Sequence, residues 1–191
     1  MRGNSQKALK EWASVVKALE KGQQIFLLRK GGIAEKNGAF RMEESEFFLF
    51  PTFEHQDKEK LKPSVQGLVD EAQKQAQVWA GKIALSCYAE VTEVFQVREI
   101  EPLLKLSQSH IWSEEMIRER FNWRPEEPLY IPILRVYRLK GVLLIDALER
   151  YKGCKSWIDF DRPIPTKGAK PVLDDMEFQL QEERIRTILL H

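Results

Sequence analysis

The chain has 191 residues, of which 43% are hydrophobic and 31% are charged, and its formal net charge is +1. This apolar content argues against disorder, because burial of apolar side chains can offset the entropy lost on ordering. No apolar run approaches the roughly 20 residues of a bilayer-spanning helix, and residues 1–7 lack the apolar centre of a secretion signal. We therefore expect one soluble, cytoplasmic domain over residues 1–191.

The N-terminal quarter predicts a helix and two strands. Four apolar residues recur at helical spacing within residues 6–21, namely Leu9, Trp12, Val16 and Leu19. Gly22 follows them and can end a helix in left-handed geometry. The apolar runs 24–28 and 47–50 predict strands that begin a central sheet over about residues 23–50, and Pro51 is expected to stop the second one.

The rest of the chain continues this alternation. Helical spacing indicates a helix over about residues 65–79 and a short helix from Ser113, and β-branched and aromatic residues indicate strands over 83–98 and 129–139. Pro132 favours an edge position or a bulge in the last of these strands. Residues 143–151 fit a strand or a helical turn equally well. Asp174 and Glu177 resemble a capping pair that opens a final helix over about 175–190.

The order of elements decides the expected fold class. Strands do not alternate one-for-one with helices, which argues against a doubly wound parallel sheet. We expect an α+β fold with a mostly antiparallel sheet or a partly closed barrel and flanking helices.

The net charge hides an uneven distribution. Residues 1–41 contain nine Lys or Arg against three Asp or Glu, and residues 135–170 contain nine against four. If these segments meet in space they form a positive face that could attract phosphate-rich partners. The alternative is an ordinary mixed surface in which acidic segments neutralise them.

Arg29-Lys30-Gly31-Gly32 follows the first expected strand. Adjacent glycines allow backbone N–H groups to approach an anion, and the two cations could assist. The spacing differs from that of a P-loop. A plain turn with exposed charges is the alternative.

Glu54 and His55 follow the second expected strand. A histidine beside a carboxylate can act as an acid or base, or contact a ligand. Neighbouring residues of an extended segment point to opposite sides, so Glu54 need not touch His55. The alternative is a strand-end turn that satisfies loop backbone groups.

Arg135, Tyr137 and Arg138 lie on the strand 129–139. Arginine beside an aromatic ring is a common arrangement for contacting a phosphate and stacking on a base. The same residues also suit a sheet-edge strand whose charges discourage aggregation.

The segment 153–157 contains Cys154, Lys155 and Trp157. A neighbouring cation can activate a thiol, but no histidine is near in sequence, so a catalytic role would need one nearby in space. Lys155 and Trp157 are candidates for ligand contact instead. Cys87 lies far from Cys154 in sequence and both are expected to be free thiols. No metal site is expected, because Cys and His are too few, and nothing indicates a cofactor.

These segments together resemble the prokaryotic domain-of-unknown-function family 1802 over nearly the whole chain. The resemblance is carried by Trp12, Gly22, 27–33, 50–56, Lys62-Pro63, 135–138 and 153–157. That family has no assigned catalytic residues. Some members occur beside a restriction-endonuclease catalytic domain, which implies an accessory or recognition role in restriction–modification for this chain.

Three hypotheses follow. The leading one is a binding module for DNA, RNA or a phosphate ligand, in which the basic segments supply the contacts. The second is a small enzyme that acts on a nucleotide or phosphorylated substrate with His55, Glu54 and Lys30. The third is a structural assembly protein that forms homo-oligomers. They would be separated by whether the polar segments converge in space.

Overall fold

One six-stranded sheet organises the molecule, which is a computed structural model that describes residues 3–30 and 42–191. The strand order is β5-β1-β2-β3-β4-β6. The strands are β1 Asn4–Trp12, β2 Glu46–Thr52, β3 Lys82–Val97, β4 Leu129–Asp146, β5 Trp157–Pro165 and β6 Lys170–Pro171. Only β1 and β2 run parallel, whereas every other pair is antiparallel. The fold is α+β with a mostly antiparallel sheet, as expected.

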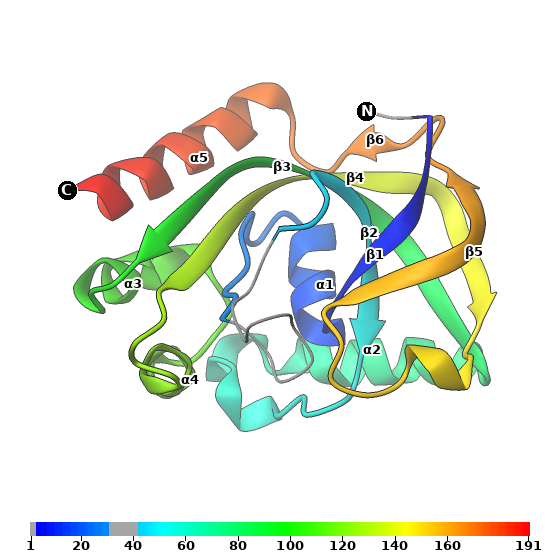
Figure 1. Ribbon diagram of the computed structural model, residues 1–191, viewed down its shortest axis with the longest axis horizontal. Helices are drawn as coiled ribbons and strands as arrows, with labels where there is room; N and C mark the ends of the chain where they lie inside the picture. The colour runs from blue at the N-terminus through cyan, green and yellow to red at the C-terminus, as the bar shows by residue number, and fades with distance from the viewer. Residues whose placement is uncertain (1–2, 31–41) are drawn as a thin grey trace.

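Within the described residues, five helices flank this sheet, and Figure 1 shows their placement. They are α1 Ala13–Glu20, α2 Gly67–Val78, α3 Glu101–Lys105, α4 Glu114–Asn122 and α5 Asp175–Leu190. Short 3-10 turns occur at Lys58–Lys60, Pro63–Val65, Leu106–Ser109 and Glu149–Tyr151. The expected helices at 65–79, 113 and 175–190 are confirmed, and Asp174 and Glu177 form the capping box that the sequence indicated.

The expected helix over residues 6–21 is wrong in its first half. Residues Asn4–Trp12 form β1, which pairs with β2 on one side and β5 on the other. Helical spacing of Leu9 and Trp12 with later apolar residues is also compatible with a strand followed by a helix. Pairing with two neighbouring strands satisfies the backbone of this segment, and only α1 remains helical. Gly22 does adopt the left-handed conformation, with φ of 68°.

The expected strand at 24–28 is replaced by an irregular segment along the edge of β4. Its only ladder contacts among the described residues are single bridges from Phe26 to Ile133 and from Arg29 to Tyr130. Gly31, Gly32 and most of the connection to β2 fall outside the described residues. The central sheet therefore does not include residues 23–30.

Pro51 does not stop β2, which continues to Thr52. The register explains this difference: β3 pairs only with the first residues of β2, Glu46–Phe48, whereas β1 pairs along it to Thr52. Pro51 therefore has a strand neighbour on one side only, where a missing N–H is tolerated.

The long β3–β4 ribbon exceeds both expected strands. β4 extends to Asp146, so the undecided residues 143–146 are strand. The register shifts between Val91 and Glu93, opposite Leu134 and Ile133, which is the bulge that nearby Pro132 indicated. β5 was missed entirely, because residues 157–165 contain two prolines and three charged residues and show little strand character alone.

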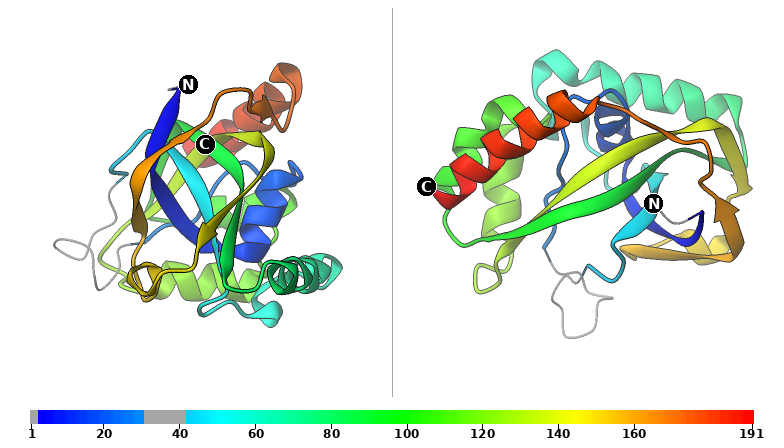
Figure 2. Two further views of the ribbon diagram at one scale, coloured as in Figure 1. Left: turned by 90° about the vertical axis from the view of Figure 1, so that its right-hand side faces the viewer. Right: turned by 90° about the horizontal axis from the view of Figure 1, so that it is seen from above.

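The two faces of the sheet pack two separate cores. Phe47 and Leu49 of β2 join the larger core with α1, α4 and α5, whereas Phe48 and Phe50 join a smaller core beneath β5. This alternation is the period-two pattern of a strand. Figure 2 shows α1 and α2 on one side of the β3–β4 ribbon and β5 on the other. The curled sheet thereby brings the ends of β1 and β2 close to the loop before β5.

Candidate functional site

The segment after β2 is held in an uncommon conformation. Thr52 Oγ1 accepts a hydrogen bond from the Glu54 backbone N–H at 3.1 Å, and His55 then takes a left-handed conformation with φ of 58°. A non-glycine residue there is uncommon and needs support from its surroundings. Gln56 provides some of it, because its side-chain oxygen accepts from the Ser14 N–H at the start of α1, 2.9 Å away.

Glu54 joins this segment to β1 and to the loop before β5. Its carboxylate lies 3.2 Å from the Lys10 ammonium and accepts from the Gly153 N–H at 3.1 Å. Lys10 also donates to the Gly153 carbonyl at 2.9 Å. Burial would raise the pKa of Glu54, but the bonds from Gly153 and Lys10 outweigh it and the pKa is lowered. Glu54 is therefore an anionic clamp that holds the loop in place.

This clamp places a thiol beside an imidazole. Cys154 Sγ lies 3.6 Å from His55 Nε2, although the two residues are 99 positions apart in sequence. Both side chains belong to exposed residues. The histidine that the sequence lacked near Cys154 is thus supplied in space.

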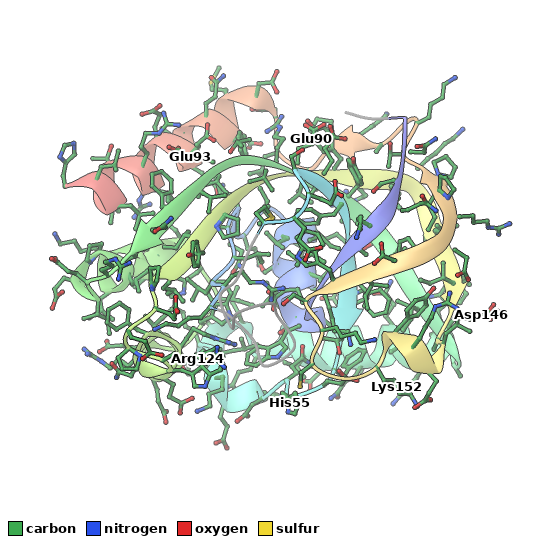
Figure 3. All side chains as sticks on the ribbon, in the orientation of Figure 1. His55, Glu90, Glu93, Arg124, Asp146 and Lys152 are labelled. Carbon is green, nitrogen blue, oxygen red and sulfur yellow. The ribbon has the colours of Figure 1, made fainter. Side chains whose placement is uncertain are left out.

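On its other side, His55 lines a surface groove of about 440 Å³. The groove lies between the end of β1, the loop after β2 and α4. Its lining residues are Trp12, His55, Asp57, Lys60, Met116, Glu119, Arg120 and Trp123. In Figure 3, His55 lies at the lower edge of the molecule, with Arg124 to one side and Lys152 to the other. The volume is within the range of small-ligand sites, about 300–1,000 Å³.

Trp123 lines the groove and also carries a stacked cation. The Arg124 guanidinium stacks on Trp123 at 4.7 Å from the ring centroid, and Arg124 has a positive φ of 52°. Trp123 is nevertheless 39% exposed. One face of the indole is thus covered by a cation while part of the ring remains open to a ligand.

Arg120 is the notable charge of this groove. It is partly buried, and no hydrogen bond or ion pair to its guanidinium occurs within the part of the chain that the structure describes. Burial lowers its pKa although the nearby carboxylates of Glu11 and Glu119 oppose this, and an arginine stays charged at neutral pH. The other groove cation, Lys60, is paired with Glu119 and lies 3.9 Å from Glu115. Arg120 is therefore the groove cation available to an anion.

The first predicted basic site does not stay on the surface. Arg29 lies 3.3 Å from the Glu11 carboxylate and donates to the Lys10 carbonyl at 3.1 Å. Lys30 is 6% exposed, and its ammonium bonds the Phe121 carbonyl and lies over the Phe121 ring. Burial lowers the pKa of Lys30. Arg29 therefore contacts the end of β1 next to Lys10, whereas the Lys30 side chain packs against Phe121 in the interior.

The β4 residues lie at a different place, between α1 and α5. Arg135 is 8% exposed and bonds the Asp174 carbonyl and the Asp175 carboxylate at 3.1 and 2.6 Å. Tyr137 donates to Glu90 at 2.7 Å, and burial and Glu90 together raise the pKa of Tyr137 to about 12. Arg138 donates to the carbonyl at the end of α1, that of Glu20. These side chains anchor elements of the fold.

Lys155 lies on the surface, whereas Trp157 is partly buried. Lys155 is exposed and its ammonium donates to the Arg150 carbonyl at 3.2 Å. Trp157 begins β5, and its ring meets the edge of Phe47 with centroids 5.2 Å apart. Segments 51–56 and 153–157 thus converge, with Arg29 near their rim, and segment 135–138 stays apart.

Of the groove residues, only His55 was predicted from sequence as a site residue. Trp12 was assigned to the core of a helix, and Arg120 and Trp123 were not considered. A usable signal existed: Arg120 and Trp123 are three residues apart at the end of a short helix, just before Pro125. That spacing places two side chains on one side of a helix end.

Within residues 3–30 and 42–191, no three His, Cys, Asp or Glu side chains gather as they would around a metal ion. No helix in that part of the chain has the length and apolar character to cross a bilayer. A larger hollow of about 530 Å³ lies between β5 and the end of β4, but Asp161 and Asp146 in it are paired with Arg150 and Lys82.

The fold and the groove define an α+β domain with a curled antiparallel sheet and a surface groove. The chain belongs to the family described as domain of unknown function (DUF1802), whose model matches residues 8–184. The solved structures that resemble it include ASCH from Zymomonas mobilis, with 12% identity over 93% of each chain and a TM-score of 0.45. A mutant ASCH protein from Zymomonas mobilis is 13% identical over 96% of this chain and 99% of that one, with a TM-score of 0.44. No curated protein matches the sequence.

Proposed function

We propose that this chain is a nucleic-acid-binding module whose groove receives one nucleotide unit of a single strand. The observation that carries the proposal is Arg120, which lines the groove together with Trp12 and Trp123 and makes no hydrogen bond or ion pair within the described residues. An unpaired cation can bind a phosphate, and an indole can stack on a base of any sequence.

The charges of the groove limit how much strand it holds. Asp57 and Glu119 line it alongside Lys60 and Arg120, so the lining has no large positive excess. A surface that follows a phosphate backbone would carry several unpaired cations. The basic segments do adjoin where β1 pairs with β5, but several of their cations are matched by carboxylates, as Lys7 is by Asp159. A single base and its phosphate therefore suit the groove better than a long duplex.

The hypothesis of an enzyme that uses His55, Glu54 and Lys30 together receives less support. None of the contacts among the described residues joins Lys30 to Glu54 or His55, because Lys30 lies under Phe121. For the assembly hypothesis, α5 exposes 79% of Met176 and 73% of Leu180. Light scattering of the purified chain would show whether that surface forms homo-oligomers.

Binding is tested by fluorescence anisotropy with labelled single-stranded DNA, single-stranded RNA and the matching DNA duplex at low salt. We expect Trp123→Ala to weaken single-strand binding by about tenfold, since one stacked base contributes about 1–3 kcal/mol. Phe53→Ala is the matched control, because Phe53 is an aromatic residue of the loop after β2 that is 40% exposed but does not line the groove.

The ligand preference also tests the cellular setting that the family resemblance implies. Preference for DNA would support an accessory role in DNA processing or restriction–modification. Binding to RNA alone would contradict that role while leaving the groove proposal intact. Absence of binding to every probe at low salt would remove the proposal altogether.

A further inference from the structure

The exposed thiol beside the groove is the strongest feature that the proposed function leaves unused. Cys154 follows Gly153, which has φ of 83°, in the loop between the turn Glu149–Tyr151 and β5. Its Sγ is 3.6 Å from His55 Nε2. An imidazole at this distance can accept a thiol proton, and the thiolate is the reactive form of cysteine.

The contact is built by the surrounding structure and does not depend on two loose side chains. Both backbone groups of Gly153 are bonded, its N–H to Glu54 and its carbonyl to the ammonium of Lys10. Lys10 is only 7% exposed, so this anchor belongs to the interior edge of the sheet. The loop that carries the thiol and the segment that carries the imidazole are therefore held together by the same clamp.

The charges near the thiol come from three elements. Lys10 on β1 is paired with Glu54, and Lys152 is paired with Glu149 at 2.7 Å. Lys155 contacts a backbone carbonyl and no carboxylate within the described part of the chain. Lys155 is the next residue after Cys154, and its positive charge can attract an anionic co-reactant to this loop.

The second cysteine provides an internal comparison. Cys87 lies in β3 with no exposed surface, and burial raises the pKa of its thiol to about 12. It contacts the Ser86 hydroxyl at 3.7 Å and has no imidazole partner among the described residues. A reagent in solution therefore meets one accessible thiol and one protected thiol in the same folded chain.

We propose that Cys154 and His55 form a thiol–imidazole pair that makes Cys154 a site of reversible mixed-disulfide formation with a low-molecular-weight disulfide such as oxidised glutathione. His55 Nε2 accepts the Sγ proton, and the thiolate attacks one sulfur of the disulfide. The new Cys154–glutathione bond forms as the glutathione–glutathione bond breaks. The departing glutathione thiolate takes the proton, so one thiol and one disulfide remain on each side of the reaction.

The adduct has a predictable consequence for the groove. His55 touches Cys154 on one side and lines the groove on the other. A tripeptide attached to Sγ would crowd the groove entrance and displace the imidazole from it. This consequence rests on the proposed nucleic-acid binding, whereas the thiol chemistry does not.

The chemistry is tested on the full chain with oxidised glutathione, followed by intact-mass analysis and peptide mapping. We expect one adduct per folded chain, located on Cys154 and removed by dithiothreitol, with Cys87 unmodified until the chain is denatured. His55→Asn, which tolerates the left-handed backbone, should slow the modification by about tenfold or more, because it removes the proton acceptor.

Two controls keep this test decisive. Cys154→Ser should take up no glutathione in the folded state. If His55→Asn does not fold, Glu54→Gln replaces it, because loosening the loop should also slow the reaction. Equal rates for the wild type and a folded His55 or Glu54 variant would overturn the proposal, and so would modification of Cys87 in preference to Cys154.

The consequence for the groove is measured separately. Glutathione attached to Cys154 should weaken single-strand binding by about tenfold, which is the contribution of about one stacked base. Removal of the glutathione by dithiothreitol should restore the affinity. Failure of the reduced chain to bind any oligonucleotide removes the proposed function and leaves the thiol chemistry standing. Unchanged binding by the modified chain overturns the link between thiol and groove.

Discussion

Two arginines of this chain, Arg135 on β4 and Arg120 at the end of α4, serve different ends. Arg135 stacks on Phe178 at 4.7 Å and bonds both Asp174 and Asp175, so it joins β4 to the start of α5. Arg120 lines the groove together with Trp123 and makes no hydrogen bond or ion pair in the described part of the chain. An arginine–aromatic pair in a sequence therefore identifies neither role. What distinguishes them is whether the fold already satisfies the guanidinium.

The largest expected effect is the loss of stability on replacing Arg135, whose guanidinium is hydrogen-bonded within the fold. Arg135→Ala should lower the free energy of unfolding by about 3 kcal/mol, because it removes two charge-assisted hydrogen bonds and the stacking on Phe178. Asp175 is exposed and would remain in water, so no buried charge is orphaned. Urea denaturation measures the change. Arg138→Ala removes only a solvent-exposed hydrogen bond to the Glu20 carbonyl and should cost less, about 0.5–1 kcal/mol.

A second test concerns the pH dependence of stability that the buried His110 should cause. His110 is 7% exposed and packs against the rings of Phe26 and Trp112. Burial, assisted by Lys62, lowers its pKa from 6.5 to about 3. The folded state thus disfavours the proton, so its stabilising effect is complete above pH 6.5 and is lost as pH falls from 6.5 towards 3.

This group alone should lower the free energy of unfolding by about 2 kcal/mol between pH 7.5 and pH 5. Thermal or urea denaturation across that interval measures the change. In His110→Phe the same part of the pH dependence should disappear. A variant with the wild-type pH dependence would show that His110 is not the responsible group.

Replacing Arg120 should affect binding and leave stability almost unchanged, in contrast to replacing Arg135. Arg120→Met keeps the aliphatic packing and removes a partly buried charge, so stability should stay constant or rise by up to about 1 kcal/mol. Single-strand binding should weaken by about tenfold, or about 1.4 kcal/mol. Arg118→Met is the matched control on α4, since Arg118 is exposed and pairs with Glu114. Destabilisation by Arg120→Met comparable to that of Arg135→Ala would erase the distinction.

The smallest effect is the salt dependence of binding. One phosphate contact gives a slope of about −0.7 in log K against log salt concentration for a single strand. We expect a value near this for the wild type and a flatter dependence for Arg120→Met. A slope steeper than about −3 would require several phosphate contacts, and the basic segments would then contribute more than the groove geometry indicates.

Local chemistry was enough to predict several parts of the molecule. The capping pair of Asp174 and Glu177 opens α5, Gly22 ends α1 in left-handed geometry, and the apolar run 47–50 predicts β2. Each of these depends on neighbours within a few residues, so the sequence alone determines it. The α+β class followed from the order of such elements.

The tertiary structure decided the features that depend on distant partners. Residues 4–12 became β1 because β2 and β5 pair with them, and Cys154 gained His55 because Glu54 and Lys10 clamp Gly153. The same reasoning separates Arg120 from Arg135, since only packing determines which guanidinium finds a carboxylate. Pairing across long stretches of chain depends on the whole fold, and no local pattern records it.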